Sequence, residues 1–200
     1  MKVTFALPTD GKDHAFCLRC HSPGVELQHN SEGGLEFYCD GCGFVQGRCL
    51  YIGKGKFWID QENTFWHESG GVFVRRSDGK FLFFERTSWP VGLTIPSGHI
   101  DRGETGLQGA IRELREEVGI DSRDLTLVDE LDIEESCNAG ADHHHWHVYL
   151  FKTDQQNIAV VAADEGRNAQ WLSLEEALAR TMTDGVRHII LQYQRQLQTI

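Results

Sequence analysis

The sequence of 200 residues predicts an α/β (α+β) fold preceded by a small cysteine-rich segment. Two apolar runs flank residues 77–80 (SDGK), which is the pattern of a β-hairpin. Residues 105–119 carry apolar side chains at helical spacing and end in a glycine. Two Cys-x-x-Cys pairs begin at Cys17 and Cys39. We therefore expect a larger domain of helices and strands behind a small metal-binding one.

The composition excludes several classes of partner. The net charge is −11, so the protein does not have the surface of a non-specific nucleic-acid or anionic-membrane binder. No apolar run approaches the roughly 20 residues that a membrane span needs. The first residues lack the basic segment and apolar core of a signal peptide. Six cysteines without such a signal predict a cytoplasmic protein whose thiols bind metal or stay reduced.

The two cysteine pairs predict a zinc ribbon over residues 1–50. Eighteen residues separate them, a spacing typical of zinc sites. Four thiolates satisfy tetrahedral Zn²⁺ and leave no open position, so the ion is structural: its ligands are Cys17, Cys20, Cys39 and Cys42. A disulfide pair is the competing interpretation. We expect residues 51–63 to be a linker and residues 64–200 to be the main domain. The single cysteines Cys49 and Cys137 are expected to be small buried apolar residues.

The main domain opens with the hairpin, in which Gly70-Gly71 indicates a bulge or a close backbone approach. Further strands are expected over residues 125–135 and 146–152. A capping box at Ser173 opens a helix, and a last helix begins near Asp184. Four aromatic side chains are candidates for stacking on a base, although such residues are more often simply part of the core: Trp66, Phe84, Trp89 and Trp146.

The helix between these strands carries two distinct faces. Its buried stripe is expected to contain Leu107, Ala110, Ile111, Leu114 and Val118. Glu113, Glu116 and Glu117 lie at i, i+3 and i+4, so their carboxylates share a second face and repel one another. A solvated acidic face is the ordinary interpretation of such a cluster. A hard divalent cation would reverse the repulsion, because Mg²⁺ binds a few carboxylates together with substrate phosphate oxygens.

The residues around this helix favour the metal. Their spacing resembles the Nudix box at every specified position: Gly98, Glu104, Arg112, Glu113, Leu114, Glu116, Glu117, Gly119 and Ile120. A chance match is on the order of one in a billion per start position. The resemblance implies an α/β/α sandwich with a mixed sheet. It also implies hydrolysis, dependent on Mg²⁺ or Mn²⁺, of a nucleoside diphosphate linked to another moiety.

The resemblance also implies roles for individual residues. Glu113, Glu116 and Glu117 hold the catalytic cations, and Arg112 orients a catalytic glutamate by a salt bridge. The base is Glu116 or Glu117, or a loop acid such as Glu165, which stands six residues before a tryptophan. The substrate is a nucleotide-derived small molecule, and because such enzymes often pair we expect a homodimer.

Two alternatives remain open at this stage. A zinc ribbon before a Nudix domain is similar to the architecture of NADH pyrophosphatases, but those enzymes carry a proline-containing motif after the box and residues 121–152 contain no proline. A nucleotide-sensing regulator would use the domain for binding alone. The intact box and the few basic residues of the ribbon favour the enzyme.

The histidine run at 143–147 is the last unusual feature. On a strand, His143, His145 and His147 would share one face. Such a face is either a metal or phosphate site or, in the interpretation we prefer, a pocket-lining or surface face.

Overall fold

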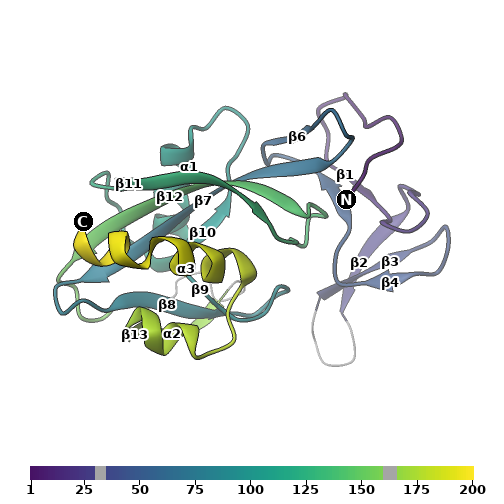
Figure 1. Cartoon of the computed structure of the whole chain (residues 1–200). Coiled ribbons are helices and arrows are strands. Elements are labelled where there is room, and N and C mark those ends of the chain that lie inside the picture. The colour runs from purple at the N-terminus through teal and green to yellow at the C-terminus, as the bar shows by residue number, and fades with distance from the viewer. Residues whose placement is uncertain (30–34, 160–165) are drawn as a thin grey trace.

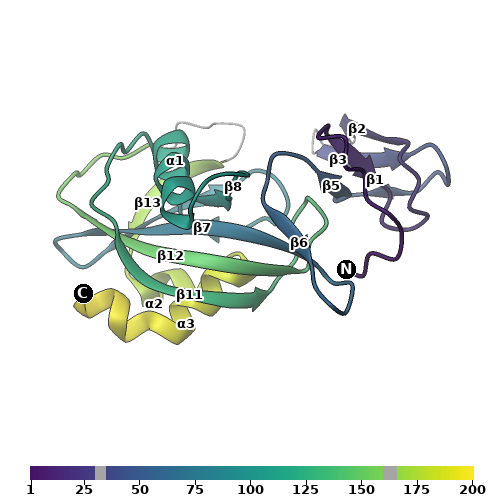
Figure 2. The same cartoon turned by 90° about the horizontal axis from the view of Figure 1, so that it is seen from above.

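The computed structural model describes residues 1–29, 35–159 and 166–200. Its main body has three layers, with a mixed sheet between one helix on one face and two on the other (Figures 1 and 2). The sheet order is β11-β12-β7-β8-β13, where the strands are Thr126–Glu134, His143–Thr153, Phe65–Arg76, Phe81–Arg86 and Gly166–Leu172. The short strands β6 (Phe57–Ile59) and β10 (Ser97–His99) also pair with β7, and β9 (Leu93–Thr94) pairs with β8. The predicted α/β/α sandwich is confirmed.

Strand β7 is the centre of the sheet. It runs parallel to β12, with His67 opposite His144 and Gly70 opposite His147. Its middle is buried on both faces, as expected of a central strand. The glycine pair marks a close approach: a Cβ on Gly70 would lie 3.3 Å from the carbonyl oxygen of Gly106 in the helix above. The absence of a side chain at Gly70 therefore allows the helix to pack directly against the backbone of β7.

That helix, α1 (Gly106–Val118), has both of its expected ends. Thr105 forms a capping box with Gln108, and Gly119 adopts the left-handed conformation with φ of 70°. The expected buried stripe was wrong at Leu107, which is 38% exposed, and Ile111 is only partly buried. The helix is rotated so that its small residues and two glutamates face the sheet instead: Gly106, Gly109, Ala110, Glu113, Leu114, Glu117 and Val118 are buried.

The other face of the sheet is covered by α2 (Leu174–Leu178) and α3 (Asp184–Thr199). Ser173 caps α2 through the expected capping box. Apolar side chains of both helices join the larger core cluster, which includes Val186, Ile189 and Ile190 of α3 and Phe73 of β7. The hairpin turn is also as predicted, with Gly79 at φ of 84° between β7 and β8.

The N-terminal unit lies beside this body (Figure 2). It contains a three-stranded sheet of β2 (Val25–His29), β3 (Leu35–Cys39) and β4 (Val45–Gln46), and a pair of β1 (His14–Phe16) with β5 (Leu50–Ile52). Its apolar cluster continues into the body through Phe65 and Ala141. The segment 51–63 is not an unstructured connection, because β5 ends in it and β6 pairs with β7. Within the described residues, the structure contains no helix with the length and apolarity to cross a membrane.

Candidate active site

The glutamates of α1 lie beside β10 at one side of a cavity. Glu113 and Glu117 are buried, whereas the side chain of Glu116 is 50% exposed. Glu113 and Glu116 line the cavity, and one carboxylate oxygen of Glu117 accepts the backbone N–H of Ser97 at 2.7 Å. Glu113 and Glu116 therefore face the cavity, whereas Glu117 turns toward the backbone of Ser97. The three carboxylates are not among the groups of described residues whose donor atoms all lie within 4.8 Å of one another, so the shared metal site stays a prediction.

Arg112 joins these carboxylates into a network. Its guanidinium donates to Glu104 at 3.0 Å, to Glu113 at 2.5 Å and to Glu116 at 3.3 Å. It also donates to the carbonyl oxygen of His99 at 2.8 Å, which ties the helix to β10. Burial alone would lower the pKa of Arg112, but the hydrogen bonds with Glu104 and Glu113 outweigh it and raise that pKa.

Gly98 explains why the loop passes so close to the helix. A Cβ at this position would lie 2.3 Å from a carboxylate oxygen of Glu113. Gly98 is paired with Gly70 of β7, so two glycines stand side by side where the helix packs. The backbone of β10 can therefore press on the Glu113 carboxylate and hold it at the cavity.

The cavity has a volume of about 500 Å³, within the range of small-molecule sites. The box residues form one wall, and Tyr51 of the N-terminal unit forms another together with Lys54 and Gly55, which follow β5. The third wall is the loop after β11, which bonds to the N-terminal unit: the N–H of Cys49 donates to Asn138, and that of Tyr51 donates to Ala139. The N-terminal unit is thus part of the cavity rather than an appendage.

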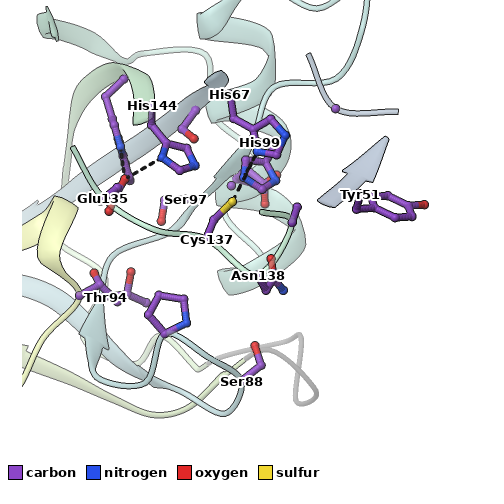
Figure 3. A pocket seen from close by; sticks show the side chains of 18 of the residues that line it. Tyr51, His67, Ser88, Thr94, Ser97, His99, Glu135, Cys137, Asn138 and His144 are labelled. Carbon is purple, nitrogen blue, oxygen red and sulfur yellow. Dashed lines mark hydrogen bonds and ion pairs between the residues drawn. The ribbon is translucent and has the colours of Figure 1, made fainter. Parts of the chain in front are cut away.

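The floor of the cavity holds a group that the sequence did not predict. His67, His99, Cys137 and His144, hereafter the His–Cys cluster, place one donor atom each within 4.8 Å of one another (Figure 3). Nδ1 of His67 lies 3.1 Å from Nε2 of His99 and 3.5 Å from the sulfur of Cys137. The members come from β7, β10, the loop after β11 and β12. No spacing in the sequence relates them, and only the sheet register brings them together.

Burial keeps the His–Cys cluster uncharged. It lowers the pKa of His99 to about 4 and that of His144 to about 3. It also holds the pKa of His67 well below the ordinary value, with smaller contributions from the other two rings. Burial raises the pKa of the Cys137 thiol to about 11. At neutral pH the cluster is therefore three imidazoles and a thiol.

The odd-numbered histidines occupy the opposite face of β12. His145 lies 2.7 Å from Asp132, and His147 contacts Glu130 at 2.6 Å and Glu68 at 2.8 Å. Glu130, His145 and His147 also form a group with the geometry to hold a metal ion. The expected shared face is present, and the even-numbered His144 is the member that lines the cavity.

The four aromatic candidates for base stacking lie in different surroundings. Trp146 lines the cavity and donates to Glu135, and Trp89 is 39% exposed beside Arg48. Phe84 is a core residue, and Trp66 stacks on Trp58 away from the cavity wall. Glu165 lies outside the described residues.

The predicted zinc cysteines converge. Cys17, Cys20, Cys39 and Cys42 place their sulfurs within 4.8 Å of one another, and the closest pairs are 3.5 and 3.8 Å apart. Four thiolates so placed suit a tetrahedral zinc ion. The glutamates of α1 suit a different ion, because carboxylate oxygens without nitrogen or sulfur are the donors of Mg²⁺ and Mn²⁺. The donor chemistry of both sets suits the ions that the sequence predicts, and in the cysteine set the donor atoms also already lie within 4.8 Å of one another.

Comparisons with known proteins match the main body to one family. The family model of the NUDIX domain matches residues 66–193. The asymmetrical bis(5'-nucleosyl)-tetraphosphatase of Mus musculus is 32% identical over 98 residues, which cover 49% of this chain and 67% of that protein. Its namesake in Caenorhabditis elegans is 31% identical over 115 residues, 55% of this chain and 80% of that protein.

Solved structures of other proteins show that the fold is also similar. The C. elegans Ap4A hydrolase in a binary complex superposes with a TM-score of 0.55 at 22% identity, over 67% of this chain and 99% of that one. A MutT NUDIX hydrolase from Burkholderia pseudomallei gives a TM-score of 0.55 at 26% identity, over 64% and 97%. The region matched by the family model lies in the main body, and the four-cysteine unit precedes it.

Proposed function

Because this chain belongs to the Nudix family, we propose that it cleaves a nucleoside diphosphate linked to another moiety, using the carboxylates of α1. The protein is a hydrolase that acts on pyrophosphate bonds. The observation that supports our assignment of the site is the Arg112 network, which gathers Glu104, Glu113 and Glu116 at the cavity.

Divalent metals such as Mg²⁺ or Mn²⁺ serve this family, and we assign them to Glu113, Glu116 and Glu117. When bound, such an ion polarises phosphate oxygens and lowers the pKa of a coordinated water. Arg112 keeps the carboxylates in place, because its planar fork contacts several of them at once. We further assign structural zinc to the four cysteines, within a ribbon over residues 1–50 and ahead of a hydrolase domain over residues 64–200.

In the proposed reaction, the oxygen of a water molecule forms a bond to a phosphorus atom of the pyrophosphate. The bond from that phosphorus to the bridging oxygen breaks, and the bridging oxygen leaves on the other phosphate with the electron pair. The proton of the water passes to a carboxylate of Glu116, the half-exposed member of the group. Glu117 is held by the N–H of Ser97, which suits a fixed ligand better than a mobile base.

We propose dinucleoside polyphosphates as the first substrates to test, since the related enzymes of mouse and C. elegans are named for cleaving a bis(5'-nucleosyl) tetraphosphate. The cavity carries cations suited to phosphates. Lys54 lies at its wall, and the buried Nε of Arg86 has no hydrogen-bond partner among the described residues. Tyr51 offers an aromatic ring at the same wall.

The test is a screen of dinucleoside polyphosphates, nucleotide sugars, NADH and nucleoside triphosphates with Mg²⁺ or Mn²⁺, with products identified by mass. Reaction in ¹⁸O-labelled water identifies the phosphorus that is attacked. On the best substrate, Glu116→Gln should lower turnover by roughly a hundred- to ten-thousand-fold. The control is Glu134→Gln, an exposed glutamate of β11.

Two results would contradict the proposal. Unchanged turnover in both Glu116→Gln and Glu117→Gln would show that these carboxylates are not the catalytic group. Tight binding of a nucleotide without cleavage of any compound would favour a nucleotide-sensing protein instead.

A further inference from the structure

We propose that the His–Cys cluster is a second zinc site, distinct from the four-cysteine site and from the glutamates of α1. Its ligands are His67, His99, Cys137 and His144. It provides four protein donors and no open position, which is the composition of a structural rather than a catalytic zinc site.

The spacing of the donor atoms matches the edges of a zinc tetrahedron. With Zn–N bonds of about 2.05 Å and Zn–S bonds of about 2.3 Å, two nitrogens lie about 3.3 Å apart and a nitrogen and a sulfur about 3.6 Å apart. The distance from His67 to His99 is 3.1 Å, and that from His67 to Cys137 is 3.5 Å. The same geometry gives about 3.8 Å between two sulfurs, and the four-cysteine site shows 3.5 and 3.8 Å. The distances compared are therefore close to those that the ion requires, and all four donor atoms of each cluster lie within 4.8 Å of one another.

One ring of the cluster has a buried nitrogen without a hydrogen bond to any described residue. Nδ1 of His144 is buried and has no hydrogen-bond partner in the part of the chain that the structure describes. A carboxylate oxygen of Glu135 lies 3.8 Å from this nitrogen. Figure 3 shows His144 with Glu135 on one side and the other three members on the other. Histidines bound to zinc commonly direct their second nitrogen at a carboxylate, and Glu135 is placed to receive it.

The charges around the cluster also permit an ion. Buried neutral imidazoles are in the form that binds metal, and a coordinated thiol loses its proton. The positive charges of Arg86 and Arg112 lie near His99 and would repel a bound cation. The charge of Arg112 is, however, already paired with Glu104 and Glu113. The Cys137 thiolate supplies one compensating negative charge. Burial raises the pKa of the nearby Glu135 to about 7, and a cation beside it would favour its ionised form.

An ion here would fix the third wall of the cavity. Cys137 lies in the loop after β11, directly before Asn138 and Ala139, which accept hydrogen bonds from the N-terminal unit. Binding Cys137 to three histidines of the sheet would therefore fasten this loop, and through it the N-terminal unit, to the body. The site would stabilise the junction of the two parts at the place where substrate enters.

Zinc content and X-ray absorption of the full chain test the proposal. Protein purified without chelator and washed with excess Mg²⁺, which removes zinc from the carboxylates, should contain two equivalents of zinc. The mean coordination should be about 2.5 sulfurs and about 1.5 nitrogens per zinc, halfway between a four-sulfur site and a site with one sulfur and three nitrogens. Cys20→Ser should keep one equivalent, with mostly nitrogen ligands.

Variants on one strand locate the second ion. His144→Gln should reduce zinc to one equivalent with sulfur ligands alone, while the matched control His143→Gln, which faces the other side of β12, should keep two. One equivalent with sulfur ligands alone in the unmodified protein would overturn the proposal, and that measurement does not depend on any variant folding. None of these results depends on the substrate, so they stand apart from the proposed catalytic activity.

Discussion

Gly98 illustrates how a single hydrogen atom in place of a side chain shapes this site. Because an added Cβ would meet the end of the Glu113 side chain, Gly98→Ala should displace that carboxylate rather than unfold the protein. We expect turnover to fall on the order of a hundredfold, as for a displacement of about 1 Å in a catalytic group. Steady-state kinetics and thermal unfolding measure both effects. Gly47→Ala, with nothing within 4 Å of the new Cβ, is the control, and equal turnover in the two variants would refute this role.

Arg112 acts through its shape as much as through its charge. Arg112→Lys keeps the cation but loses the fork that contacts Glu104, Glu113 and the carbonyl of His99. We expect the free energy of unfolding to fall by roughly 2 kcal/mol, the size of one hydrogen bond to a charged group, and kcat to fall with it. Chemical denaturation and kinetics check this. Arg115→Lys, an exposed neighbour on the same helix, should change neither, and an Arg112→Lys protein as stable and active as the unmodified one would contradict the expectation.

The sequence predicted site residues where they repeat along one helix, and missed them where they do not. The glutamates of α1 share a face because the helical period places them there. Nothing local relates His67, His99, Cys137 and His144, since they are gathered by strand pairing over long separations. Three neutral histidines in one buried cluster also carry no signal in the composition.

Among the elements, the turn between β6 and β7 depends on Asp60. Its carboxylate accepts from the backbone of Thr64 and from the indole of Trp66, both at 2.9 Å. The Thr64 hydrogen bond first, and then that of Trp66, lowers the pKa of Asp60 from 3.8 to about 2.

The direction of this shift gives a pH dependence. Because the folded pKa lies below the ordinary one, the ionised carboxylate stabilises the fold above about pH 4 and this stabilisation is lost as the pH falls through about 2. Asp60→Asn should therefore lower Tm at pH 7, and the difference should disappear near pH 2. Thermal unfolding across this range measures it, with Glu62→Gln as the control. A difference in Tm that is independent of pH would contradict this account.

Helix ends and turns were predictable because their chemistry is local. The capping boxes at Thr105 and Ser173 and the glycines at 79 and 119 satisfy backbone groups within a few residues. The exposure of Leu107 was not predictable in this way. It follows from Gly70 and Gly98, which draw the other side of α1 toward the sheet.

For the whole molecule, the cavity wall formed by Tyr51, Lys54 and Gly55, which directly follow the ribbon, connects the ribbon to the proposed active site. If zinc at the four cysteines orders this unit, Cys20→Ser should raise KM several-fold and change kcat less. Hydrogen exchange should increase over residues 14–52 while α1 stays protected. Cys49→Ala, outside both metal clusters, is the control. Unchanged KM in a protein shown to have lost that zinc would refute the link.

The homodimer stays a prediction of the family resemblance. Sedimentation at micromolar concentration should show a species of about twice the 22.7 kDa chain mass. A single species at the chain mass would exclude it.

Because alternate residues of a strand face opposite sides of the sheet, the pairing of β7 with β12 decides which histidines of the run at 143–147 face the cavity. In the present register, His144 stands opposite His67 on the cavity side and its odd-numbered neighbours face away. One residue added to or removed from the preceding loop would keep the ladder of hydrogen bonds but exchange the two sets. Among related proteins, the length of that loop, and not the number of histidines it precedes, would then decide which of them can assemble the His–Cys cluster.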